Sequence, residues 1–172
     1  MTDTVSDDRR IPRSALILGL AGLIPFLWSA ATHLSPALSG WAGQVMPPMF
    51  LGSYVGLTYG TVILSFMSGV LWGFATKADG GEATVAYALS VIPALWVFFT
   101  VTDASANSTI FLAAGFVGLL LLDAMYSAWG LAPRWWLRLR VMLTVVVLAC
   151  LAIPLQGYHQ QPHGTHGRDQ RA

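Results

Sequence analysis

Residues 59–74 read YGTVILSFMSGVLWGF, an apolar run in which small residues recur at a fixed interval. Two series with a spacing of four are present, one at Gly52, Gly56 and Gly60 and the other at Thr61, Ser65, Gly69 and Gly73. Residues four apart share one side of a helix, so each series forms a groove with little side-chain bulk, on a different face. Membrane helices associate through close backbone approach, which small residues permit. The pattern predicts the central helix of a membrane bundle, packed between two neighbours, although glycine is also simply common in membrane helices.

The composition indicates an integral membrane protein. Of the 172 residues, 55% are hydrophobic and only 10% are charged, whereas a soluble domain carries about 25% charged residues. Most of the surface therefore faces lipid rather than water. The net charge of +1 gives no reason to expect a nucleic-acid partner. The single cysteine, Cys150, excludes an internal disulfide framework and a cysteine-based metal site.

The apolar residues form five segments, at about 14–32, 52–76, 83–101, 109–129 and 136–155. Each is long enough to cross a hydrocarbon layer of about 30 Å as a helix. We therefore predict an all-α fold, a polytopic membrane bundle of five transmembrane helices at residues 14–155. A polar arm at 1–13 would precede it, and a disordered polar tail rich in His, Gln and Gly would follow at 156–172.

The first apolar segment has an alternative interpretation, and the segment that follows it is not expected to cross the membrane. The first segment could be a secretory signal, but it exceeds the usual apolar core of about 7–15 residues, so we expect a retained helix. Residues 33–51 contain prolines and glycines that break a spanning helix. Their aromatic and methionine side chains suit a segment that lies at the membrane surface.

The distribution of lysine and arginine predicts the orientation. One side of a five-pass layout receives Arg9, Arg10, Arg13, Lys77, Arg134, Arg138 and Arg140. The other side has only Arg168 and Arg171, at the distal tail. Because positive side chains gather on the cytoplasmic side, we predict a cytoplasmic (or matrix) N terminus and an outside C terminus.

Asp123 is the one acidic residue well inside a predicted span. An ionised carboxylate at membrane depth costs about 2.5–3.5 kcal/mol on insertion scales, so it needs a partner or water. The fourth and fifth spans are antiparallel around a turn near residue 132, which brings Asp123 level with residues 138–141. We predict a structural ion pair with Arg138 or Arg140. The alternative is a proton relay or a ligand counter-ion.

Pro25 and Pro93 lie inside the first and third spans, where each is expected to kink its helix. A proline lacks the backbone donor and frees a carbonyl one turn earlier, here at Ala21 and Leu89. Broken helices with freed carbonyls form substrate sites in transporters. Prolines also simply bend packed helices, and the absence of a charge beside either kink favours bending.

Histidine is the only residue type here that suggests a metal or haem. His33 and the tail residues His159, His163 and His166 all fall on the outer side. Nothing in the tail sequence orders these rings, so we expect a solvated tail and no cofactor. The sequence also contains no paired carboxylates, nucleophile-and-base grouping, phosphate-binding glycine loop or HExxH motif, so we expect no enzymatic activity.

Five blocks of sequence together resemble a known family. They are GLIPF at 22–26, YGTVILSFMSGVLWGF at 59–74, SVIPALW at 90–96, Asp123 near the end of the fourth span, and PRWWLRLRVMLTVVV at 133–147. The chain resembles the bacterial membrane family called domain of unknown function 3429, whose mitochondrial relative is transmembrane protein 69. Ser68 stands where the family's SFxGGxxWG block has glycine. The resemblance implies a small multi-pass protein of a bacterial inner membrane, or of the mitochondrial inner membrane in a eukaryote, and it implies no activity.

Three functions remain open from the sequence. We expect first a non-catalytic accessory, assembly or stabilising subunit that binds other subunits of a larger membrane complex, respiratory or photosynthetic, because the features are packing features. A small transporter or channel would use Asp123 with the kinks at Pro25 and Pro93. A haem- or quinone-binding redox subunit would rely on His33 and the tail.

Overall fold

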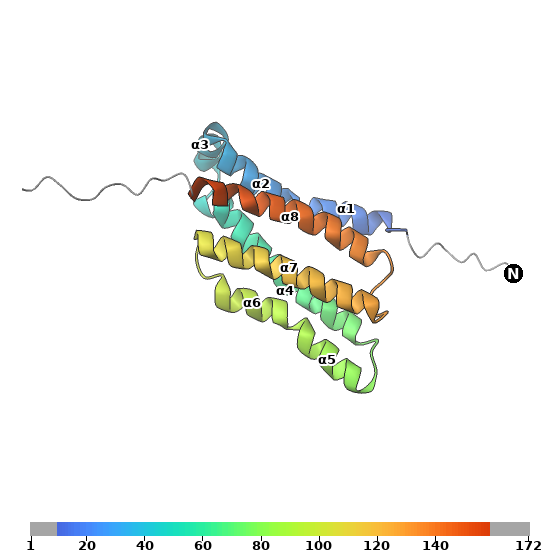
Figure 1. Cartoon of the computed structure of the whole chain (residues 1–172). Coiled ribbons are helices and arrows are strands. Elements are labelled where there is room, and N and C mark those ends of the chain that lie inside the picture. The colour runs from blue at the N-terminus through green and yellow to red at the C-terminus, as the bar shows by residue number, and fades with distance from the viewer. Residues whose placement is uncertain (1–9, 159–172) are drawn as a thin grey trace, which may run out of the picture.

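The computed structural model describes residues 10–158, and this part of the chain is helical throughout apart from its connections (Figure 1). The elements in chain order are α1 (Arg13–Ala21), α2 (Ile24–Leu34), α3 (Pro36–Val45), the short 3-10 helix η1 (Pro48–Phe50), α4 (Gly52–Ala75), α5 (Gly80–Ser90), α6 (Ile92–Thr100), α7 (Ala106–Ala128) and α8 (Trp136–Tyr158).

The prediction of five membrane-spanning helices is confirmed. Five stretches of the described residues are long and apolar enough to cross a membrane: Arg13–Leu34, Gly52–Ala75, Gly80–Thr100, Ala106–Ala128 and Trp136–Gln156. The first combines α1 and α2, and the third combines α5 and α6. The apolar runs therefore correspond to spans within a few residues, and α8 continues to Tyr158, slightly past the expected end of the membrane domain.

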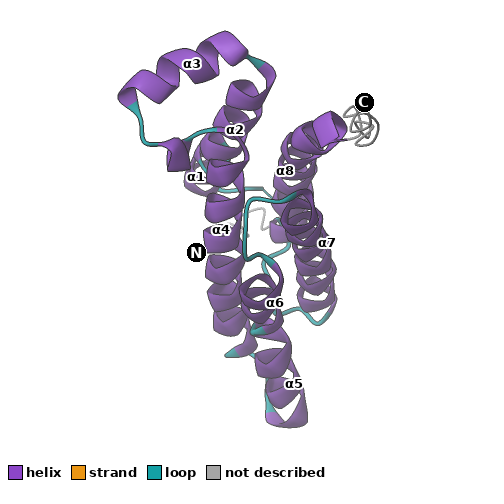
Figure 2. Cartoon of the chain, turned by 90° about the vertical axis from the view of Figure 1, so that its left-hand side faces the viewer, coloured by secondary structure: helices purple, strands orange, loops and turns teal. Residues whose placement is uncertain are grey.

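Helix α4 runs along one side of the view in Figure 2, next to α2 and α6. It packs against α2, against α7 and against both halves of the α5–α6 span, whereas α8 packs chiefly against α7 and α2. The core between these helices is apolar and fully buried, with Phe26, Leu64, Leu112 and Phe116 each no more than 1% exposed. The helix that carries the small-residue series therefore packs against three of the four other spans, as α7 also does.

Both prolines expected to kink a span lie at a break in it. Pro25 follows the break between α1 and α2, and Pro93 follows the break between α5 and α6. A proline fits the first turn of a helix, where its missing N–H would have no partner in any case. At the second break the Ala94 N–H donates a hydrogen bond of 2.9 Å to the Ser68 hydroxyl of α4. A neighbouring helix thus supplies a partner for a backbone group next to the kink.

The segment between the first two spans folds back across one end of the bundle as α3 and η1 (Figure 2). Hydroxyls of α2 fix the point at which α4 begins: Ser29 donates to the Gly52 carbonyl at 2.8 Å, and the Gly52 N–H donates to Thr32 at 3.1 Å. Gly52 has a φ of +55°, a conformation that side chains other than glycine rarely adopt. The segment is therefore a connection rather than a span, as predicted.

The basic residues of the described chain lie at one end of the bundle. This end contains the start of α1, the α4–α5 turn and the α7–α8 turn (Figure 1). Lys77 of the α4–α5 turn donates a hydrogen bond of 3.0 Å to the Leu131 carbonyl of the α7–α8 turn. Within residues 10–158 the opposite end carries no lysine or arginine. There the α6–α7 turn holds Asp103, whose pKa is lowered by hydrogen bonds from Ser105 and Ser108.

Candidate functional site

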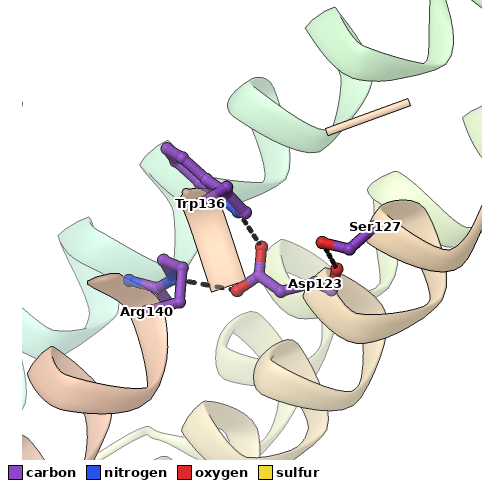
Figure 3. Close-up of polar contacts among 4 residues, drawn as sticks. All are labelled: Asp123, Ser127, Trp136 and Arg140. Carbon is purple, nitrogen blue, oxygen red and sulfur yellow. Dashed lines mark hydrogen bonds and ion pairs between the residues drawn. The ribbon is translucent and has the colours of Figure 1, made fainter. Parts of the chain in front are cut away.

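Asp123 of α7 is fully buried and is held by two side chains of α8 (Figure 3). Arg140 donates from Nε to Asp123 Oδ2 at 2.8 Å, and Trp136 donates from its indole N–H to Asp123 Oδ1 at 2.7 Å. One turn further along α7, Ser127 donates to the Asp123 backbone carbonyl at 2.8 Å. Both carboxylate oxygens therefore have a donor, and one of these donors is charged.

This arrangement places Arg140, rather than Arg138, against the carboxylate. Arg140 is only 5% exposed and Asp123 is fully buried, so the ion pair is largely removed from the solvent. Removing two charges from water is costly, but a close, hydrogen-bonded pair recovers much of that cost. Once the pair is formed its net charge is zero, which suits a low-dielectric interior. It links α7 to α8 near the turn between them.

The small-residue series of α4 lie in different surroundings. A Cβ added at Gly56 would come within 2.7 Å of the Ser29 hydroxyl of α2, and one added at Gly60 would come within 2.6 Å of Leu112 of α7. These two glycines thus occupy close helix contacts. In the second series Thr61 is half-buried and donates to the Leu57 carbonyl of its own helix, whereas Ser65, Gly69 and Gly73 are exposed. A Cβ at Gly69 or Gly73 would meet nothing within 4 Å.

A cavity of about 510 Å³ lies between the first span, α4 and α8, at the place where α4 and α8 do not pack closely. Its lining is apolar and rich in aromatic rings, among them Phe26, Tyr59, Phe74 and Phe116. On either side of the break before Pro25 the first span packs differently, because α2 packs on both α4 and α8 whereas α1 packs on α8 without close packing on α4. The volume is within the range of small-molecule sites in proteins, about 300–1,000 Å³.

Two buried polar atoms of α8 belong to residues that line this cavity. The described residues provide no hydrogen-bond partner for Arg140 Nη2 or for the Thr144 hydroxyl oxygen. Thr144 is 2% exposed and follows Arg140 by one helical turn, so the two side chains share one face of α8. An unsatisfied buried polar group costs about 1–3 kcal/mol, which makes these atoms candidates for contact with a ligand.

The other residues considered from the sequence lie apart from this cavity. His33 is exposed near the end of α2, and the described residues contain no group of three or more His, Cys, Asp or Glu that could hold a metal. His159, His163 and His166 fall outside the described residues. Pro25, Pro93 and Asp123 are not among the residues that line the cavity. The structure therefore does not bring the prolines and the carboxylate together in one site.

Sequence reasoning missed several residues that the structure places at important contacts. Trp136 was not a candidate residue from the sequence, but its indole N–H donates a hydrogen bond to Asp123. Its position 13 residues after Asp123, just beyond the predicted turn, could have indicated this. The signal for Thr144 is weaker: it follows Arg140 by one helical turn and shares its face, but the sequence left the choice between Arg138 and Arg140 open.

The comparisons with known proteins agree with this architecture. The family model described as "Protein of unknown function (DUF3429)" matches residues 11–156, which covers all five spans. The chain belongs to this family. The resemblance inferred from the sequence blocks is therefore confirmed, including its relation to transmembrane protein 69.

Two curated relatives of this family member are called Transmembrane protein 69. The one from Xenopus tropicalis is 33% identical over 161 residues, which is 88% of this chain and 57% of the relative. The one from Mus musculus is 25% identical over 148 residues, 84% of this chain and 56% of the relative. The chain thus spans just over half the length of these relatives. No solved structure matches it significantly.

Proposed function

We propose that this membrane protein is a non-catalytic accessory subunit that binds another integral membrane protein through the exposed face of α4. The observation that supports this is the row Ser65, Gly69 and Gly73, which is uncovered although α4 packs against three other spans. Val62 and Phe66, 57% and 64% exposed, lie on the same side. Small residues flanked by larger apolar ones permit a second helix to approach closely in lipid.

We also propose the membrane in which the protein lies and the side of that membrane on which its N terminus lies. The arrangement of the basic residues at one end of the bundle supports a cytoplasmic (or matrix) location for the N terminus, with the α6–α7 turn on the outside. The family relationship to Transmembrane protein 69 of animals, together with the five spans, supports a bacterial inner membrane, or the inner mitochondrial membrane in a eukaryote.

Purification in mild detergent from the native membrane tests the proposal. The wild-type chain should copurify with a larger membrane protein in a fixed ratio, and Gly69→Leu with Gly73→Leu should abolish this because the added side chains fill the groove. Gly118→Leu is the matched control: Gly118 is an exposed glycine of α7 with no atom near its Cβ position.

The control variant should retain the partner. A wild-type chain that purifies alone would contradict the proposal. So would a partner that remains bound equally well in the double leucine variant, because the contact would then lie on another face.

A further inference from the structure

The cavity beside Arg140 has features of a binding site that packing alone does not require. We propose that it binds the ring of a neutral, carbonyl-bearing lipophile of the quinone class, whose carbonyl oxygen accepts hydrogen bonds from Arg140 Nη2 and the Thr144 hydroxyl. The site goes beyond the proposed accessory role. Its opening shares Phe66 with the α4 face proposed to bind a partner, so it is tested on the purified chain alone.

The cavity has a mouth that faces the lipid. Among its lining residues, Leu18 of α1 is 72% exposed and Phe66 of α4 is 64% exposed. These two helices have no close packing with each other, because the first span bends after α1. A molecule dissolved in the bilayer can therefore enter sideways between α1 and α4, and a hydrocarbon tail can remain in the lipid.

The charges favour a neutral ligand. Among the described residues, Arg140 is the only charged one that lines the cavity, and its charge is balanced by Asp123 at 2.8 Å. A carboxylate or phosphate in the cavity would give this buried group a net negative charge, which is costly at low dielectric. A carbonyl oxygen accepts a hydrogen bond without adding charge.

The donors and the walls favour a flat ring with an acceptor at its edge. Arg140 and Thr144 are one turn apart on α8 and both line the cavity, so we place the ligand oxygen between these two side chains. Phe26, Tyr59 and Phe116 contribute aromatic rings to the lining of the cavity. Aromatic faces pack well against a planar ring. An acyl chain alone would leave both buried polar atoms without a partner.

The position of the site along α8 suits a ligand that lies within the bilayer. Arg140 lies near the start of α8, at the basic end of the bundle, whereas Thr144 and Val147 lie further along the helix. A polar ring would thus sit below the membrane surface with its carbonyl toward the basic end. No electron transfer is part of the proposal, which concerns binding only.

Thermal unfolding of the purified full chain in detergent tests this inference. Decylubiquinone should raise the unfolding temperature in a saturable way, because a ligand of the folded state shifts unfolding by mass action. Decylbenzene, which has the same tail and a ring without carbonyl oxygens, should give a much smaller shift. This comparison uses only the wild-type chain and is unaffected by any folding defect of a variant.

Variants locate the site. Thr144→Val removes the hydroxyl while keeping the shape, and it should weaken the apparent affinity for decylubiquinone about fivefold to tenfold. Thr61→Val is the matched control, because Thr61 bonds within its own helix and does not line the cavity. It should leave the affinity unchanged.

Several results would overturn the inference. Equal shifts with decylubiquinone and decylbenzene would mean that the cavity accepts any apolar molecule. An unchanged affinity in Thr144→Val would place the quinone elsewhere. A tightly copurified phospholipid that decylubiquinone does not displace would assign the cavity to that lipid instead.

Discussion

At the scale of single residues, the buried contacts of Asp123 show how a charge is accommodated in an apolar bundle. Its two oxygens receive an arginine and an indole donor from the same helix, α8. A buried pair of this kind is weak evidence for net stability, because the cost of removing both charges from water offsets their attraction. Removing one partner of the pair is strongly destabilising, because the other partner then remains as a buried, unpaired charge.

We therefore predict that Asp123→Ala destabilises the folded protein by about 3–5 kcal/mol, as is typical when a buried pair loses one partner. The double variant Asp123→Leu with Arg140→Met should recover most of this loss, because no charge remains buried. Equilibrium unfolding in mixed detergent micelles measures both free energies. Single and double variants that lose the same amount would contradict the ion-pair interpretation.

The residue scale also shows where sequence reasoning succeeds. Antiparallel geometry around a short turn was enough to bring Asp123 level with Arg140. The choice between Arg138 and Arg140 required the rotation of α8, and the same rotation turns Thr144 toward the cavity. Hydropathy fixes the length of such a helix but not its rotation, so these features could not be predicted.

At the scale of elements, α4 uses its glycines for two purposes. Gly56 and Gly60 allow α2 and α7 to approach, whereas Gly69 and Gly73 leave a smooth outer face. The spacing of four predicted that small residues would form grooves, and it does not reveal which groove is filled within the chain. The proline breaks were also visible in the sequence, but the cavity that accompanies the first break was not.

This difference predicts unequal effects of the same substitution on the isolated protein. Gly56→Val places its side chain against Ser29 and should cost about 1–3 kcal/mol of stability, as overpacking does. Gly69→Val, on the same helix and facing open space, should change the free energy of unfolding by much less. Unfolding in detergent compares the two variants. Equal losses would mean that both glycines lie in packed contacts.

At the scale of the whole molecule, five apolar runs, short turns and one basic end define the protein. An odd number of spans puts the two chain ends on opposite sides of the bilayer, and the α4–α5 and α6–α7 turns must then also lie on opposite sides. The number of spans could be predicted because bilayer thickness sets the length of each run. The partner that binds the open face of α4 could not be predicted, because its identity depends on the sequence of a second protein.

Site-directed cysteine labelling tests this layout most directly. In a Cys150→Ala background, single cysteines replace Asp79, exposed next to the α4–α5 turn, and Thr102, exposed in the α6–α7 turn. A membrane-impermeant maleimide is then applied to spheroplasts before and after lysis. We predict that Thr102→Cys is labelled in intact spheroplasts and that Asp79→Cys is labelled only after lysis. Labelling of both cysteines from the same side would contradict the five-span bundle, and the reverse pattern would contradict its orientation.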